Sequence, residues 1–137
     1  MNAASSPGAT RPSILVVEDF HLLRVSVVQW LKFRFPGCIV HGVGSGEEGL
    51  VHVRTFPPDI VLMDIDLPGI NGLEATQRIR LESPETAVVM LTMHDTPNHR
   101  LAASNAGAVA YVPKIELEDR LGEVIEKLLG SRAGKAS

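Results

Sequence analysis

The sequence predicts an α/β fold, a doubly wound parallel sheet of five strands with helices on both faces. Two observations lead to this prediction. Five short apolar runs alternate with five segments of helical periodicity, which is the pattern of repeated strand–helix units. The run at 60–63 is apolar at every position, as expected of a parallel strand that is buried on both faces. Right-handed crossovers should join successive strands.

The first half of the chain contains three predicted strands and two predicted helices. The strands are at 14–17, 38–43 and 60–63. The first helix has apolar residues at helical spacing, namely Leu23, Val27, Trp30 and Leu31. Pro36 ends this helix. Ser45 and Glu48 form a capping-box pattern, which predicts a second helix that ends before Pro57.

The second half continues the same alternation. The predicted ranges are a helix at 72–81, a strand at 87–91, a helix at 96–106, a strand at 109–112 and a final helix from Leu117. Pro97 in the first turn of the fourth helix and Gly107 just past its end give that helix clear limits. The final helix has the most regular apolar pattern, with Leu117, Leu121, Val124, Ile125, Leu128 and Leu129 on one face.

The 137 residues fit one domain, expected at 13–130. Residues 1–12 are predicted to form a flexible N-terminal tail that lacks the apolar core of a signal peptide. Residues 131–137 are expected to form a polar C-terminal tail or the start of a linker. No run approaches the ~20 apolar residues that a membrane span needs, so no membrane partner is expected and the expected location is the cytoplasm.

Charge and cysteine content exclude several kinds of site. The net charge of −3 argues against a nucleic-acid-binding surface, since phosphate groups require clustered Lys and Arg. The single cysteine, Cys38, excludes an internal disulfide and a cysteine-based zinc site, and its apolar surroundings favour a buried strand residue.

Polar residues follow four of the predicted strands. Glu18 and Asp19 follow the first strand and Asp64 the third, whereas Thr92 follows the fourth and Lys114 the fifth. Because the carboxyl ends of parallel strands meet at one edge of the sheet, where ligands bind, these side chains should converge. Acids before a helix are common as caps, so the acidic pair alone would mean little. Its joint placement with the other residues indicates a functional site.

The chemistry of such a site favours a hard divalent cation. Three carboxylates in contact repel one another, and one Mg²⁺ together with the Lys114 ammonium would neutralise them. The absence of thiol ligands favours Mg²⁺ over Zn²⁺. An aspartate can attack phosphorus and form an aspartyl-phosphate. Thr92 could then donate its hydroxyl to a phosphoryl oxygen and Lys114 could pair with another.

These residues resemble the receiver (CheY-like) domain of two-component response regulators, most closely those of the LuxR/NarL type. The resemblance rests on the Glu18–Asp19 pair, the segment Leu-Met-Asp64-Ile-Asp-Leu-Pro-Gly-Ile-Asn-Gly-Leu-Glu, Thr92, and Gly-Ala-Val-Ala-Tyr-Val-Pro-Lys114, and it extends from about 13 to 129. It implies the flavodoxin-like strand order 2-1-3-4-5. No helix-turn-helix output domain follows in this sequence.

The resemblance also implies a role for each site residue. Asp64 would accept a phosphoryl group from a sensor histidine kinase or a phosphotransfer protein. Asp19, Asp64 and the backbone carbonyl of Asp66 would bind Mg²⁺, and Glu18 would act mostly through water. Lys114 would pair with the phosphoryl group.

Thr92 and Tyr111 would form a switch pair that changes the partner preference of the surface around the fourth helix and fifth strand. That surface would contact an output domain or a second copy of the chain. The only catalysis would be self-phosphorylation and self-dephosphorylation, so the protein would not be an enzyme. The fourth helix is rich in alanine and should be the least firmly docked. Met93 is expected to narrow access to the phosphoryl group.

Two other interpretations of the motifs fit the sequence less well. The segment 44–49 matches the G-x-G-x-x-G pattern of dinucleotide sites, but Glu47 and Glu48 would repel a pyrophosphate, and helix capping explains the residues. Asp64 and Asp66 also resemble the nucleophile motif of haloacid dehalogenase-type phosphatases. In that family the nucleophile follows the first strand, whereas here the paired acids come first.

Overall fold

The computed structural model describes residues 11–136. The strands are β1 (Ser13–Val17), β2 (Ile39–Val43), β3 (Ile60–Asp64), β4 (Ala87–Thr92) and β5 (Ala110–Pro113). The helices are α1 (His21–Arg34), α2 (Gly46–Thr55), α3 (Gly72–Glu82), α4 (Pro97–Ala106), the short 3-10 turn η2 (Lys114–Glu116) and α5 (Leu117–Ala136). All strands are parallel and lie in the order β2-β1-β3-β4-β5. The predicted fold class and strand order are confirmed.

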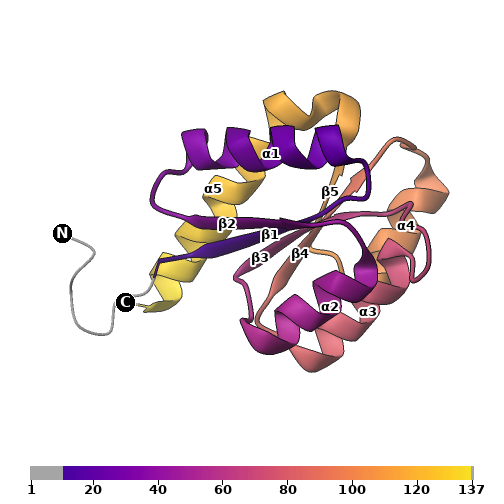
Figure 1. Ribbon diagram of the computed structural model, residues 1–137, viewed down its shortest axis with the longest axis horizontal. Coiled ribbons are helices and arrows are strands. Elements are labelled where there is room, and N and C mark those ends of the chain that lie inside the picture. The colour runs from indigo at the N-terminus through magenta and orange to yellow at the C-terminus, as the bar shows by residue number, and fades with distance from the viewer. Residues whose placement is uncertain (1–10, 137) are drawn as a thin grey trace.

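Helices cover both faces of the sheet. Figure 1 shows α1 and α5 on one face and α2, α3 and α4 on the other. Alternate strand residues enter different cores: Ile60 and Leu62 of β3 pack beneath α1 and α5, whereas Val61 and Met63 pack beneath α2, α3 and α4. Every residue of β3 is buried, because this central strand has a helical layer on each side.

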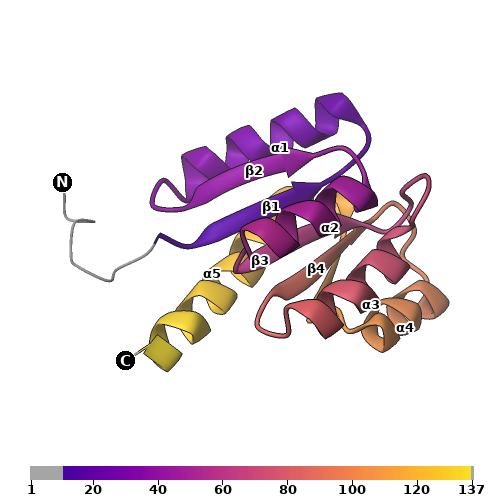
Figure 2. The same ribbon diagram turned by 60° about the horizontal axis from the view of Figure 1, so that its bottom comes forward.

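The helices begin and end at residues suited to those positions. The side chains of Ser45, Asn71 and Thr96 accept hydrogen bonds from backbone N–H groups in the first turns of α2, α3 and α4. Gly107 ends α4 with φ of 105°, a left-handed conformation that favours glycine. Figure 2 brings α2, α3 and α4 forward and shows the strands running side by side behind them.

The amino ends of the strands are tied together on the edge opposite the predicted site. The Asp59 carboxylate accepts a hydrogen bond of 2.8 Å from the backbone N–H of Ser13, and the Asp59 carbonyl accepts one of 3.0 Å from Ala87. The buried hydroxyl of Thr86 donates to the carbonyl of Pro58 at 2.7 Å. These bonds hold β1, β3 and β4 in register at the edge that carries no predicted site residue.

Two differences from the predicted limits concern the C-terminus and β2. Helix α5 continues to Ala136, so residues 131–136, predicted as a polar tail, are helical. Arginine, alanine and lysine in this segment are good helix formers, but it has no large apolar residue whose spacing would reveal a helix. Cys38 is buried as predicted but precedes β2. Most of the predicted N-terminal tail lies outside the described residues.

Candidate functional site

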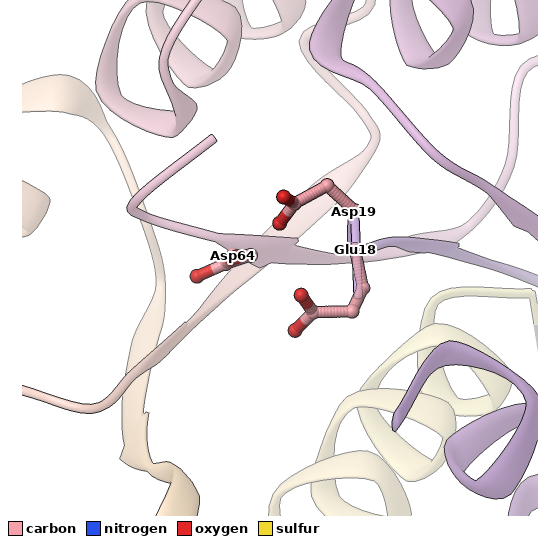
Figure 3. A group of neighbouring side chains, drawn as sticks. All are labelled: Glu18, Asp19 and Asp64. Carbon is pink, nitrogen blue, oxygen red and sulfur yellow. The ribbon is translucent and has the colours of Figure 1, made fainter. Parts of the chain in front are cut away.

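Three carboxyl groups converge at the carboxyl end of the sheet. Glu18 and Asp19 directly follow β1, and Asp64 is the last residue of the neighbouring strand β3. One oxygen from each carboxyl group lies within 4.8 Å of the others, and Figure 3 shows the three side chains gathered in one place. Glu18 and Asp64 are 2% and 3% exposed, whereas Asp19 is open to solvent. The three acids therefore converge as predicted from the strand ends.

Lys114 brings a positive charge to two of these acids. It lies at the start of η2, directly after β5, and its Nζ is 2.7 Å from Glu18 Oε1 and 3.3 Å from Asp64 Oδ1. Burial raises the pKa of Glu18, although the ammonium of Lys114 opposes the shift. Burial alone would lower the pKa of Lys114, but Glu18 and Asp64 outweigh it and raise that pKa. Lys114 is therefore held as a cation.

The backbone after β3 fixes the orientation of Asp64. The N–H of Asp66 donates to Asp64 Oδ1 at 3.2 Å, so both described contacts of this carboxylate engage the same oxygen. Gly72 N–H donates to the carbonyl of Ile65 at 3.2 Å, which brings the start of α3 against the end of β3. A Cβ at Gly72 would collide with the Asp64 carbonyl oxygen, so only glycine fits this close approach.

The donor set fits a hard cation such as Mg²⁺. It offers carboxylate oxygens, two of them on nearly buried side chains, and no thiol. Glu18 Oε2 accepts a hydrogen bond of 3.1 Å from Phe20 N–H, and Glu18 Oε1 pairs with the Lys114 ammonium at 2.7 Å. One ammonium does not neutralise three clustered carboxylates, so a divalent cation would complete the charge balance of the site.

The two predicted switch residues meet at the loop between β4 and α4. Thr92 is fully buried, and its hydroxyl donates to the His94 carbonyl at 3.0 Å and accepts from His94 N–H at 2.9 Å. The Tyr111 hydroxyl donates to the same carbonyl oxygen. Burial raises the pKa of Tyr111, while the neighbouring Thr92 hydroxyl and the charge of Arg100 oppose the shift.

The side chains of the β4–α4 loop form one rim of the site. His94 Nε2 lies 3.7 Å from Asp66 Oδ2, and its ring stacks on His99 with centroids 5.3 Å apart. An open groove beside this rim is lined by residues that include Asp19, Asp66 and His99. Met93 is 72% exposed, so it packs against little of the protein, and the expected narrowing of access has no support in its packing.

Several residues that shape the site are not evident from the sequence pattern. Arg24 Nη1 donates to the Glu18 carbonyl at 2.8 Å, which holds the backbone of the acidic pair. His94 acts through its main-chain carbonyl, which any residue possesses. Arg100 reaches the Tyr111 ring from α4. Of these three residues, only Arg24 has a signal in the sequence. It lies near the start of α1, where a long side chain can reach back to the residues before the helix.

A profile of the response regulator receiver domain matches residues 14–126. The chain belongs to this family. Receiver domains are signalling switches that bind Mg²⁺ through an acidic pocket and interact with histidine kinases or phosphotransfer proteins, which accords with the acidic cluster at the end of β1 and β3. The comparisons give no support to the haloacid dehalogenase-type alternative.

The chain is similar in sequence to bacterial regulators. The chain is 34% identical over 120 residues to the transcriptional activator protein ExaE of Pseudomonas putida, covering 88% of this chain and 56% of that protein. It is 36% identical over 103 residues to the response regulator UvrY of Escherichia coli K12, covering 74% and 47%. The chain thus spans about half the length of these relatives.

Solved structures agree with the fold. A LuxR-family two-component response regulator from Aurantimonas sp. SI85-9A1 superposes with a TM-score of 0.82 at 32% identity, covering 89% of this chain and 87% of that one. A CheY-like receiver domain protein from Methanospirillum hungatei JF-1 gives 0.80 at 28% identity, covering 91% and 99%. Within residues 11–136, no helix has the length and apolar character to cross a membrane.

Proposed function

We propose that this receiver domain is a phosphorylation-dependent switch of the cytoplasm, with Asp64 as the phosphoacceptor and Mg²⁺ as the cofactor. The observation that carries the proposal is the position of the Asp64 carboxylate. It lies within 4.8 Å of two other acids and 3.3 Å from the Lys114 ammonium, at the carboxyl end of the central strand. A carboxylate so placed can be both a nucleophile and a cation ligand.

The transfer exchanges one bond at phosphorus for another. Lys114 and Asp66 N–H engage Oδ1 of Asp64, which leaves Oδ2 as the attacking oxygen. Oδ2 forms a bond to the phosphorus of a phosphohistidine as the phosphorus–nitrogen bond breaks, and the leaving imidazole keeps the electron pair and takes up a proton. The product is an aspartyl-phosphate. Asp64 then carries extra negative charge, which Lys114 partly balances.

The acidic residues would hold the cofactor. Asp19, Asp64 and the Asp66 carbonyl would be ligands, and Glu18, whose carboxyl group lies in the same cluster, would hold a coordinated water. The cation, when bound, screens the repulsion between the carboxylates and the incoming phosphoryl group. Thr92 would donate its hydroxyl to a phosphoryl oxygen after releasing His94, and Tyr111 would respond to that change.

The donor would be a sensor histidine kinase or a phosphotransfer protein, and the output would be a changed contact at the α4–β5–α5 face. Leu101 and Val109 on that face are 60% and 52% exposed, which suits either an output domain or a second copy of the chain. ExaE, the relative named a transcriptional activator, is longer than this chain.

The test is the intact mass of the protein after incubation with acetyl phosphate and Mg²⁺. One added phosphoryl group is expected, and it should be absent in Asp64→Asn and after chelation with EDTA. Asp66→Asn is the matched control, because it alters a neighbouring exposed carboxylate but keeps the backbone carbonyl. A wild-type protein that gains no mass at all, or an adduct that persists in Asp64→Asn, would contradict the assignment.

A further inference from the structure

The outer face of Tyr111 is covered by a charged side chain from α4. The guanidinium carbon of Arg100 lies 5.0 Å from the centroid of the Tyr111 ring, within the range of a cation–π interaction. Arg100 is itself fixed by Asp95, since its Nε and Nη2 donate to the two oxygens of that carboxylate at 2.6 and 3.0 Å. Such two-point pairing sets the plane of the guanidinium.

These contacts join the three parts of the protein that surround the switch. Asp95 belongs to the β4–α4 loop, Arg100 to α4 and Tyr111 to β5. The hydroxyl of Tyr111 also contacts this loop, because it donates to the carbonyl of His94, the residue just before Asp95. Two successive residues of the loop are therefore bound: His94 by the Tyr111 hydroxyl and Asp95 by Arg100. The contacts among Asp95, Arg100 and Tyr111 are here named the Asp95–Arg100–Tyr111 latch.

We propose that the Asp95–Arg100–Tyr111 latch holds the β4–α4 loop in the resting arrangement and slows phosphorylation of Asp64, with Arg100 as its positioning residue. The inference rests on the proposed function of Asp64. It assigns a role to Arg100 and Asp95, neither of which touches the acidic cluster.

The direction of the effect follows from the hydrogen bonds of Thr92. Both described bonds of its hydroxyl go to His94, so Thr92 must release the His94 carbonyl before it can donate to a phosphoryl group on Asp64. The latch opposes that release by keeping the His94 carbonyl and Asp95 in place. Loosening the latch lowers the free-energy cost of the rearrangement and speeds phosphorylation.

The latch is well placed to dominate the position of this loop. In α4 only Ala103 and Ala106 are buried, and two methyl groups provide little hydrophobic anchorage. The pairing of Asp95 with Arg100 lowers the pKa of the carboxyl group and raises that of the guanidinium, so both groups keep their charges at neutral pH. Contacts at the start of α4 therefore depend heavily on this polar arrangement.

The first experiment measures the rate of phosphorylation by acetyl phosphate with saturating Mg²⁺ in four proteins. Arg100→Ala removes the ion pair and the ring contact and should react about threefold to fivefold faster, given the modest strength of exposed pairs and cation–π contacts. Asp95→Asn should be faster by about twofold. The double variant should match Arg100→Ala, because both changes break one unit.

Arg54→Ala is the matched control. Arg54 also makes a two-point ion pair on the surface, with Glu82 at 2.5 and 2.8 Å, but it joins α2 to α3 away from the switch. Its rate should equal that of the wild type. An Arg100→Ala protein that is phosphorylated no faster than Arg54→Ala would overturn the proposal, as would additive effects in the double variant.

A second experiment is independent of phosphorylation. Tyr111 is the single tyrosine, so 3-fluorotyrosine gives a ¹⁹F probe of this position alone. Without Mg²⁺ and phosphodonor, the resonance should move in Arg100→Ala and Asp95→Asn but not in Arg54→Ala. If the resonance moves while even the wild type takes up no phosphoryl group, the proposed function fails and the latch contact stands. An unmoved resonance in Arg100→Ala overturns the latch.

Discussion

Thr92 and Tyr111 donate hydrogen bonds to the same acceptor, the carbonyl oxygen of His94. The two residues come from neighbouring strands, and this shared oxygen is where their positions depend on each other. If Thr92 turns towards Asp64, the His94 carbonyl keeps only the Tyr111 hydroxyl as a donor. The proposed coupling between the buried site and the α4–β5 surface would therefore pass through a main-chain atom.

Lys114→Met should lower the free energy of unfolding by about 3 kcal/mol at pH 7 without Mg²⁺, because it leaves the buried Glu18 carboxylate facing Asp64 with no cation. Urea denaturation followed by the fluorescence of Trp30, the single tryptophan, measures the change. Adding Glu18→Gln to this variant should restore part of the loss. A Lys114→Met protein as stable as the wild type would refute the role of this ion pair.

Gly72→Ala should destabilise the protein by more than about 2 kcal/mol, since the new methyl group would collide with backbone atoms of Asp64 and Ile65. Gly130 in α5 is the matched control, as a Cβ there meets nothing within 4 Å. Gly130→Ala should stabilise by about 0.5–1 kcal/mol through helix propensity. Thermal unfolding of both variants compares the two, and equal effects would show that the close approach at Gly72 is relaxed in solution.

The backbone amides of α4 should exchange hydrogen faster than those of α5. Helix α4 buries only two alanine side chains, whereas α5 buries Leu117, Leu121 and Ile125. Hydrogen–deuterium exchange of the unphosphorylated protein, read by mass spectrometry of peptides from each helix, provides the comparison. Equal protection in the two helices would mean that α4 is anchored by more than its buried area.

The stability of the protein should fall as the pH drops below about 6.5, in part because of His52. Burial, and then the charge of His41, lowers the pKa of His52 in the folded state, so the unfolded chain binds this proton more tightly. The contribution of neutral His52 to the free energy of unfolding is fully present above the unfolded pKa of about 6.5. It is lost as the pH falls from there towards the lower pKa of the folded state. In urea denaturation, His52→Gln should lose less stability than the wild type between pH 7.5 and 5. Equal losses would contradict this assignment.

The fold could be predicted because burial leaves a clear pattern in this sequence. The apolar run 60–63 belongs to a strand with a helical layer on each side, and Ser45 and Pro97 mark helix starts by their own chemistry. The end of α5 could not be predicted in the same way. Its last residues include no apolar stripe, and their helical structure follows from intrinsic propensity.

The acidic cluster and Lys114 could be predicted because each follows a strand and parallel strands share one edge. The arrangement around His94 could not, since hydrogen bonds to a carbonyl oxygen leave no trace in residue type. Arg100 is also invisible to pattern analysis, because an arginine on the exposed side of a helix is usually a solvated charge. Its two partners, Asp95 and Tyr111, become neighbours only when β4, α4 and β5 are assembled.

The alternation of β3 side chains between two separate cores has a consequence for the evolution of such a protein. Ile60 and Leu62 support one helical layer, and Val61 and Met63 support the other. Substitutions that reshape α1 therefore act on packing that α4 does not share, and their effects should add rather than interfere. A lineage can thus alter the surface on one side of the sheet and keep an inherited mechanism on the other.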